Sequence, residues 1–110
     1  MAKIKLTKTQ RGFKTGSFVD RYGSKCSIQK SSLATEDAIW LGVDDANPQI
    51  MCSKAIEMGL RERTHTEADN GWTKFYVPSD VQFSTRMHLT QKQVKELLPI
   101  LQKFVETGEI

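Results

Sequence analysis

Hydrophobic and polar residues alternate through the first third of the chain, which is the pattern of β-strands with one covered face. Residues 13–31 predict two short strands joined by a turn around Gly23, because glycine supplies the backbone freedom of a tight reversal. In the second strand Cys26 and Ile28 share one side, since side chains alternate along a strand. The other side carries only polar residues, which are Lys25, Ser27, Gln29 and Ser31.

The segment AIWLGV, residues 38–43, is apolar throughout, as in a buried strand. We expect the strand at residues 25–30 as its neighbour, and Trp40 in the core rather than on a surface. Residues 3–7 alternate as a short strand does, and residues 1–10 are otherwise expected to form a mobile basic tail.

The middle of the chain predicts a short helix followed by a polar loop. Asn47 can cap free backbone amides, Pro48 suits the first helical position, and Gly59 suits the end of the helix. Residues 61–71 form the polar loop, in which the pair Asn70–Gly71 carries the strongest hairpin-turn signal of the chain. We therefore expect a mobile tip there.

Strand character returns over residues 75–90, and the clearest helix of the chain follows. Thr90 and Gln93 have the spacing of a capping box, and Gly108 is suited to the end of the helix. Pro99 removes one backbone hydrogen bond and is expected to bend the helix. One side is apolar and must pack on the sheet or on another subunit; its residues are Val94, Leu97, Leu98, Leu101, Phe104 and Val105.

These elements predict an α+β fold: a small antiparallel sheet with a short middle helix and an amphipathic C-terminal helix packed on it. The composition, 38% hydrophobic and 26% charged, is that of a folded protein rather than a disordered one. A chain of 110 residues is too short to divide its apolar residues between two stable cores, so we expect one domain over residues 1–110.

The net charge of +3 is unevenly distributed. Residues 1–31 hold eight Lys or Arg and one Asp, a net charge of +7, whereas residues 32–72 hold three Lys or Arg and eight acids, a net charge of −5. A basic segment attracts phosphate-bearing partners and an acidic one repels them. The alternative is that the two segments neutralise each other across the folded surface.

Several classes of function receive no support from the sequence. There is no apolar run long enough for a membrane span, and the basic start lacks the apolar region of a signal peptide, so we expect a cytoplasmic protein with no membrane partner. In a reducing compartment Cys26 and Cys52 are expected to stay free. They and the two histidines, His65 and His88, lack the close spacing of a zinc site, so we expect no metal and no cofactor.

No catalytic residues are predicted, because no phosphate-binding loop, G-x-S-x-G or H-E-x-x-H motif occurs in the sequence. The acids around AIWLGV are expected to be solvated surface residues. What remains is a polar sheet face able to hold a phosphate, if the strand at 25–30 lies beside that of Arg86 and His88. The alternative is that this face is only the solvated outer surface of the sheet. The candidate ligand-binding residues are Lys25, Gln29, Lys30, Ser31, Ser32, Arg86 and His88.

Two stretches, YGSKCSIQKSSLATEDAIWLG and STRMHLTQKQVKELLPILQKFVETGEI, resemble a family of short uncharacterised proteins encoded by phages and prophages. The resemblance covers roughly two thirds of the chain and leaves out RERTHTEADNG. It implies a small accessory protein that works in the bacterial host by binding. Such a protein occludes a host protein or nucleic acid, or counteracts host defence by sequestering a nucleotide signal.

Two hypotheses follow. The first is a non-enzymatic protein that binds an anionic ligand, a nucleotide or nucleic acid, through the basic sheet face. The second is an inhibitor that docks on a host protein through its apolar helix and acidic middle segment, with partner contacts at Trp72, Leu97 and Phe104. In either case a chain this small is expected to form a homo-oligomer, with the C-terminal helix as the contact.

Overall fold

The computed structural model describes residues 3–110, which divide into two compact units. The sheet unit comprises the residues up to Asp45 together with Ser84–Ile110, and the hairpin unit comprises Ala46–Phe83. The hairpin unit is inserted between two neighbouring strands of the sheet unit, and each unit packs its own residues. That the chain forms one domain stays a prediction.

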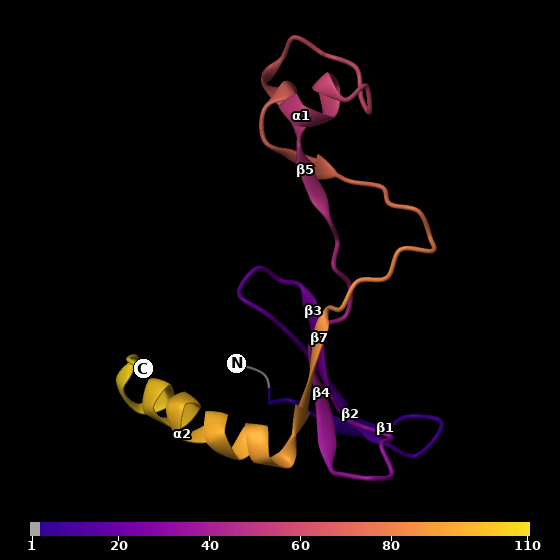
Figure 1. The fold of residues 1–110 in the computed structure, drawn as a ribbon. Coiled ribbons are helices and arrows are strands. Elements are labelled where there is room, and N and C mark those ends of the chain that lie inside the picture. Colours follow the sequence, from indigo (N-terminus) through magenta and orange to yellow (C-terminus); the bar gives the residue numbers. More distant parts are fainter. Residues whose placement is uncertain (1–2) are drawn as a thin grey trace. The chain divides into compact units, whose positions relative to one another are not determined.

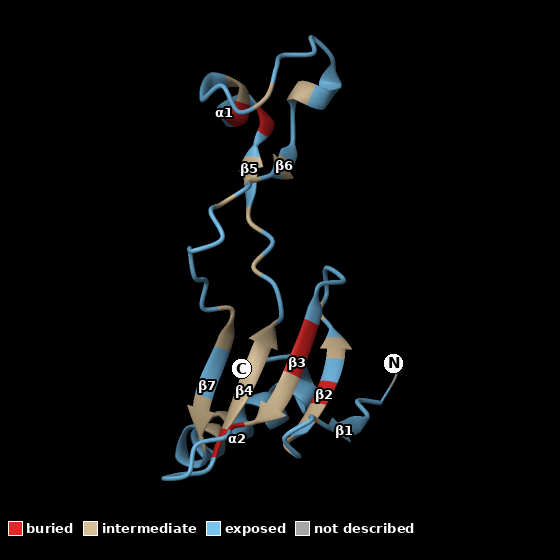
Figure 2. Cartoon of the chain, turned by 90° about the vertical axis from the view of Figure 1, so that its right-hand side faces the viewer, coloured by how far each residue is buried: buried red, intermediate tan, exposed pale blue. Residues whose placement is uncertain are grey.

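The sheet unit (Figure 1) contains a five-stranded antiparallel sheet in the order β1-β2-β3-β4-β7, and Figure 2 shows these strands side by side. Together with the helix that follows it, the sheet confirms the predicted α+β fold class. β3 and β4 are neighbours, as the sequence predicted. The strands are β1 (Leu6–Lys8), β2 (Lys14–Val19), β3 (Lys25–Lys30), β4 (Ala38–Val43) and β7 (Arg86–Thr90).

The register gives the sheet two chemically different faces. One row of paired residues runs from Leu6 through Gly16, Ile28 and Leu41 to Met87, and we call its side the apolar face. The neighbouring row has the opposite parity and defines the polar face. That row runs through Thr15, Gln29, Trp40 and His88.

The turn between β2 and β3 forms where the sequence predicted it. Asp20 Oδ1 accepts hydrogen bonds from the backbone N–H groups of Tyr22 and Ser24, each at 2.9 Å, and Gly23 has φ +82°. At the other end of β2, the prediction of a tail over residues 1–10 fails for the β1 residues, which pair with β2; residues 1–2 lie outside the described part of the chain.

The hairpin unit contains the two-stranded sheet of β5 (Gln49–Met51) and β6 (Trp72–Lys74), with α1 (Cys52–Glu57) and the short 3-10 helix η1 (Glu67–Asp69) between them. The predicted helix start at Asn47 and Pro48 is wrong. These residues precede a strand, because Gln49–Met51 pairs with β6 before the helix begins at Cys52. Gly59 does end the helix, with φ +74° and a hydrogen bond to the Ile56 carbonyl at 3.0 Å.

Two further predictions are corrected. The pair Asn70–Gly71 does not join two strands directly, because the connection from β5 to β6 includes α1 and η1. Strand structure over residues 75–90 is limited to β7, and the residues from Phe75 to Thr85, among them Pro78, lie outside the strands.

The C-terminal helix, α2 (Gln91–Thr107), begins with the predicted capping box of Thr90 and Gln93 and ends at Gly108, which has φ +75°. It continues through Pro99. None of its residues is buried, so the expected packing on the sheet is slight and most of its apolar stripe stays uncovered.

The described chain has a thin core, and the buried residues in Figure 2 occupy only short stretches. Its buried hydrophobic residues are the free cysteines Cys26 and Cys52 and the alanines Ala38 and Ala55. No helix among the described residues is long and apolar enough to cross a membrane.

Candidate ligand-binding face

The centre of the polar face is an aromatic pair formed across β4 and β7. The rings of Trp40 and His88 are stacked, with centroids 3.9 Å apart and planes inclined by 9°. Their positions follow from the register, which places the two residues directly opposite each other. His88 Nε2 also lies 2.9 Å from the Ser31 hydroxyl. Ser31 directly follows β3, so this contact from a third strand fixes the orientation of the imidazole.

A cation lies next to this pair. The guanidinium carbon of Arg86 is 5.4 Å from the centroid of the Trp40 ring, within the range of a cation–π contact. Arg86 pairs with Gly42, and a Cβ on Gly42 would lie 2.8 Å from the Arg86 Cα. Glycine at this position therefore allows β7 to approach β4 closely enough to carry Arg86 alongside the tryptophan.

The loop between β1 and β2 closes one side of the polar face. It is held by a hydrogen bond from the Thr9 N–H to the Phe13 carbonyl at 2.8 Å and one from the Phe13 N–H to Thr9 Oγ1 at 3.1 Å. Arg11 lies over the Phe13 ring at 5.5 Å. Between this loop and the sheet is a pocket of about 320 Å³, lined by Thr9, Gln10, Arg11, Phe13, Gln29, Ser32 and Trp40.

β3 and β7 are not neighbours, as the predicted site required, because β4 lies between them. The structure nevertheless brings five of the seven predicted ligand-binding residues together around Trp40, which lies in β4. They come from three places in the sheet unit: Gln29 lies in β3, Ser31 and Ser32 follow the end of β3, and Arg86 and His88 lie in β7. Gln29 and His88 are the cross-strand neighbours of Trp40, Ser31 contacts His88, Arg86 contacts the Trp40 ring, and Ser32 lines the pocket.

Lys25 and Lys30 do not join this group. Lys30 has the opposite parity in β3, and its ammonium nitrogen lies 2.7 Å from Asp37 Oδ1, which lowers the pKa of that carboxyl. Lys25 shares the polar face but is four residues from Gln29, about 13 Å along an extended strand.

Three residues of the site were not predicted. Trp40 was expected in the core, yet it is only half-buried and occupies the middle of the polar face. The sequence did contain one signal for this position. Ala38 and Gly42 lie on the same side of β4 as Trp40, and both are too small to cover its ring. For Arg11 and Phe13 the sequence indicated only that their segment is basic. The alternation of polar and apolar residues does not predict where a loop lies relative to a sheet.

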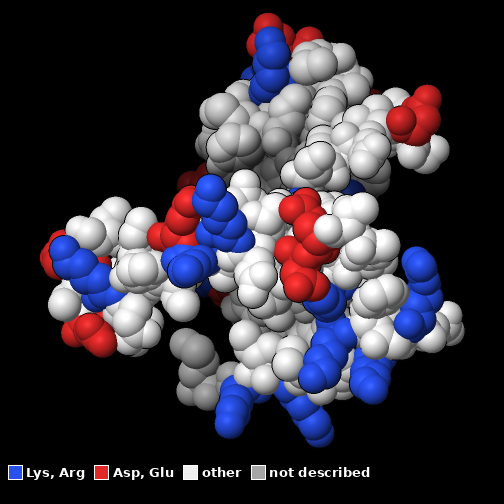
Figure 3. Space-filling view, turned by 60° about the horizontal axis from the view of Figure 1, so that its bottom comes forward, with Lys and Arg blue, Asp and Glu red and all other residues white. Residues whose placement is uncertain are grey.

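Positive charge on the surface is distributed rather than confined to the site. Figure 3 shows Lys and Arg side chains standing out over the face that it views, with Asp and Glu side chains among them. On the polar face an acid is present as well, since Asp44 Oδ1 accepts a hydrogen bond from Ser27 at 2.7 Å. Across residues 3–110 no three His, Cys, Asp or Glu side chains form a group that could hold a metal ion.

The predicted partner contacts lie in both units of the chain. In the hairpin unit Trp72 is 65% exposed and pairs with Met51, which is 51% exposed. In α2, Phe104 is exposed and Leu97 is half-buried.

Comparison of the chain with protein-family models, with curated proteins and with solved structures found no match.

Proposed function

We propose that this chain is a non-enzymatic protein that binds a nucleotide or single-stranded nucleic acid through the polar face of its sheet. The observation that carries the proposal is the stacked pair of Trp40 and His88 with Arg86 beside it. Aromatic side chains on an open sheet face are stacking platforms for nucleobases, and arginines beside them hold phosphate oxygens.

The remaining groups of the pocket fit the same ligand chemistry. Phe13 and Trp40 line it from opposite sides of the loop–sheet boundary and offer two rings to a base. Gln29 and Ser32 supply donors and acceptors for base edges or ribose hydroxyls. Arg11 adds a second guanidinium at the rim. A ligand that matches all of these side chains therefore has a nucleobase and a phosphate.

The contact between Ser31 and His88 resembles a nucleophile beside a base, but its surroundings favour a supporting role. Ser31 is only 4% exposed, and its hydroxyl oxygen also accepts a hydrogen bond from the Leu33 N–H at 3.3 Å. A buried hydroxyl engaged in this way orients the imidazole rather than attacking a substrate.

The setting that we propose is that of a phage-type accessory protein in the cytoplasm of a bacterial host, where binding would sequester a nucleotide signal or occlude a nucleic acid. The alternative is an inhibitor that docks on a host protein. The exposed pair Met51–Trp72, together with the acidic residues of the middle segment, supports that alternative, because exposed aromatic residues are frequent anchors of protein interfaces.

Fluorescence can test the binding site directly, because the chain has only two tryptophans. In a Trp72→Phe variant all tryptophan emission comes from Trp40. Titration with nucleoside triphosphates and, separately, with short single-stranded oligonucleotides should quench this emission in a saturable manner. Saturation by the oligonucleotide alone, with an affinity that falls steeply as salt is added, would identify a nucleic acid as the ligand.

The matched variants separate the site from the rest of the surface. Arg86→Gln in the same background should weaken binding by about 10-fold, as expected for the loss of one charge-assisted contact. Lys30→Gln, on the apolar face, should leave the affinity unchanged. Absence of quenching by every ligand, or equal losses in the two variants, would refute the proposal.

A further inference from the structure

One face of the Trp40 ring is already occupied. The imidazole of His88 lies against it, with ring centroids 3.9 Å apart and planes inclined by 9°. The buried Ser31 holds the imidazole in place, because its hydroxyl lies 2.9 Å from His88 Nε2. Two parallel rings at this distance are in contact and leave no room for a third ring between them. A nucleobase can therefore stack on Trp40 from one side only.

The uncovered side of Trp40 belongs to the pocket at the β1–β2 loop. Trp40 lines this pocket of about 320 Å³, whereas His88 does not. The loop contributes Phe13, and the guanidinium carbon of Arg11 lies 5.5 Å from the centroid of the Phe13 ring. Aromatic rings and guanidinium planes both stack on nucleobases. The volume is at the lower end of the range of about 300–1,000 Å³ for small-ligand sites, which suits one nucleotide.

The neighbouring positions of the polar face offer no second ring. The next row of paired residues, two positions along each strand, consists of Ser17, Ser27, Gly42 and Arg86. Within β1–β4 and β7, Trp40 is the only Phe, Trp or Tyr residue with the parity of the polar face. Proteins that bind single-stranded nucleic acid instead present several aromatic side chains on which successive bases stack. A second base would have no such ring here.

The cations of the polar face are also few. On this face of the strands β1–β4 and β7, the Lys and Arg residues are Arg86, beside Trp40, and Lys25. Lys25 is four residues from Gln29, about 13 Å along an extended strand. A groove that follows a polynucleotide is positively charged along its path. Arg11 and Arg86 suffice for the phosphates of a single nucleotide, but no row of cations continues from them.

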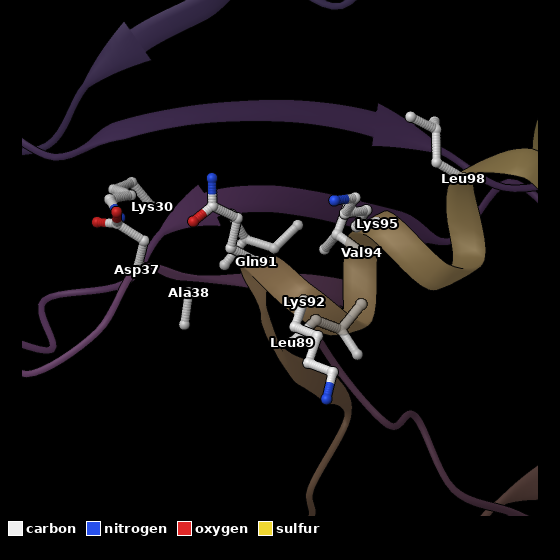
Figure 4. A pocket seen from close by; sticks show the side chains of 10 residues that line it. Lys30, Asp37, Ala38, Leu89, Gln91, Lys92, Val94, Lys95 and Leu98 are labelled. Carbon is white, nitrogen blue, oxygen red and sulfur yellow. The ribbon is translucent and has the colours of Figure 1, made fainter.

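The larger groove of the sheet unit does not extend the site. It has a volume of about 920 Å³ and lies where β4 and β7 meet the first half of α2 (Figure 4). Ile39 and Leu89 line it and pair across the two strands with the parity opposite to that of Trp40, so the groove belongs to the apolar face. None of the residues that line it is aromatic, so it offers no stacking platform to a base.

We infer that the polar face accommodates one nucleobase per chain, so that its ligand is a mononucleotide rather than a single-stranded nucleic acid. The inference rests on the proposed function and narrows its ligand class. The base stacks on Trp40 in the pocket that Phe13 lines, and the phosphates lie at Arg11 and Arg86. Further bases of a polynucleotide add no affinity, because His88 covers the other face of Trp40 and no further ring follows on the strands.

The test compares ligands of increasing length through the Trp40 emission of the Trp72→Phe variant. The ligands are mono-, di-, tetra- and octanucleotides of deoxyadenosine and, separately, of thymidine, each with a terminal phosphate. The dissociation constant expressed per base should change by less than about 2-fold along each series, whereas each base on a further stacking platform would strengthen binding about 5-fold or more. A gain of that larger size for each added base would overturn the inference.

A substitution tests the physical reason for the limit. His88→Ala uncovers the second face of Trp40 and leaves the residues of the pocket unchanged. In this variant the dinucleotide should bind about 5-fold more tightly than the mononucleotide, because a second base can then stack on the indole. Ser17→Ala is the matched control, since it also lies on the polar face but leaves the imidazole on Trp40, and it should show no such preference.

If His88→Ala keeps the circular dichroism spectrum of the parent but shows no preference for the dinucleotide, the imidazole does not set the limit and the inference is wrong. The proposed function fails in a different way, namely when no ligand in either series quenches Trp40. Binding that strengthens with every added base would leave the proposed function standing and refute the limit of one base per chain.

Discussion

Asp69 shows how much structure a single carboxylate can organise in a unit with almost no core. Its Oδ1 atom accepts hydrogen bonds from the N–H and the hydroxyl of Thr64, at 2.8 Å and 2.7 Å, and Oδ2 accepts one from the His65 N–H at 2.8 Å. Arg61 adds an ion pair at 3.6 Å. The bonds from Thr64 are the main cause that lowers the pKa of Asp69 from 3.8 to about 2.

The loop of residues 61–71 should consequently depend on pH in a defined window. A carboxyl whose pKa is lower in the folded state stabilises that state above its unfolded pKa of 3.8, and this stabilisation is lost as the pH falls toward about 2. The amide signals of Thr64 and His65 should titrate in NMR spectra with a midpoint near 2, and Asp69→Asn should increase their hydrogen exchange at neutral pH. A midpoint at 3.8, or an equal effect of Glu62→Gln, would show that the carboxylate does not hold the loop.

Parity explains both the success and the failure of the sequence analysis at single residues. Alternation placed Gln29 and Ser31 on one side of β3 and Cys26 on the other, as the structure shows. The same rule excludes Lys30 from the polar face, but the prediction grouped it by composition instead. Trp40 was assigned to the core by its hydrophobicity, although its place opposite His88 depends on a pairing between strands that no local pattern reveals.

At the scale of elements, the contact between β4 and β7 depends on Gly42. A Cβ at this position would lie 2.5 Å from the Thr85 carbonyl oxygen and 2.8 Å from the Arg86 Cα, both of which are backbone atoms that cannot rotate away. Gly42→Ala should therefore force the strands apart and displace Arg86 from Trp40.

The expected cost of Gly42→Ala is about 1–3 kcal/mol in the free energy of unfolding, measured by chemical denaturation. Gly12→Ala is the control, because Gly12 also has a positive φ, of +86°, but no atom lies within 4 Å of the added Cβ. It should cost about 1 kcal/mol, from backbone strain alone. Equal losses in the two variants would mean that β4 and β7 do not approach as closely as described.

Elements defined by local chemistry were predictable, and those defined by long-range pairing were not. The β2–β3 turn and the capping box of α2 rest on contacts within four residues, so the sequence contains their full description. β5 was mistaken for the start of a helix, because its only strand partner is β6, more than twenty residues later. The helix signal of Asn47 and Pro48 was thus overridden by tertiary pairing.

For the whole molecule, the decisive property is that an open sheet carries a different chemistry on each face. The apolar face carries the row from Leu6 to Met87, and the polar face carries the row through Gln29, Trp40 and His88. The binding that we propose therefore depends on one face of the sheet, and substitutions on the other face should leave it unchanged.

Photocrosslinking tests the central claim most directly, because it reports where a nucleobase touches the chain. The protein would be irradiated with an azido-nucleotide and, separately, with an oligonucleotide containing thiouridine, and the adducts would be located by mass spectrometry. We expect adducts at Trp40 or Phe13 that disappear in Trp40→Ala and persist in Trp72→Ala. Adducts confined to the hairpin unit, or adducts that survive Trp40→Ala unchanged, would contradict a binding site on the polar face.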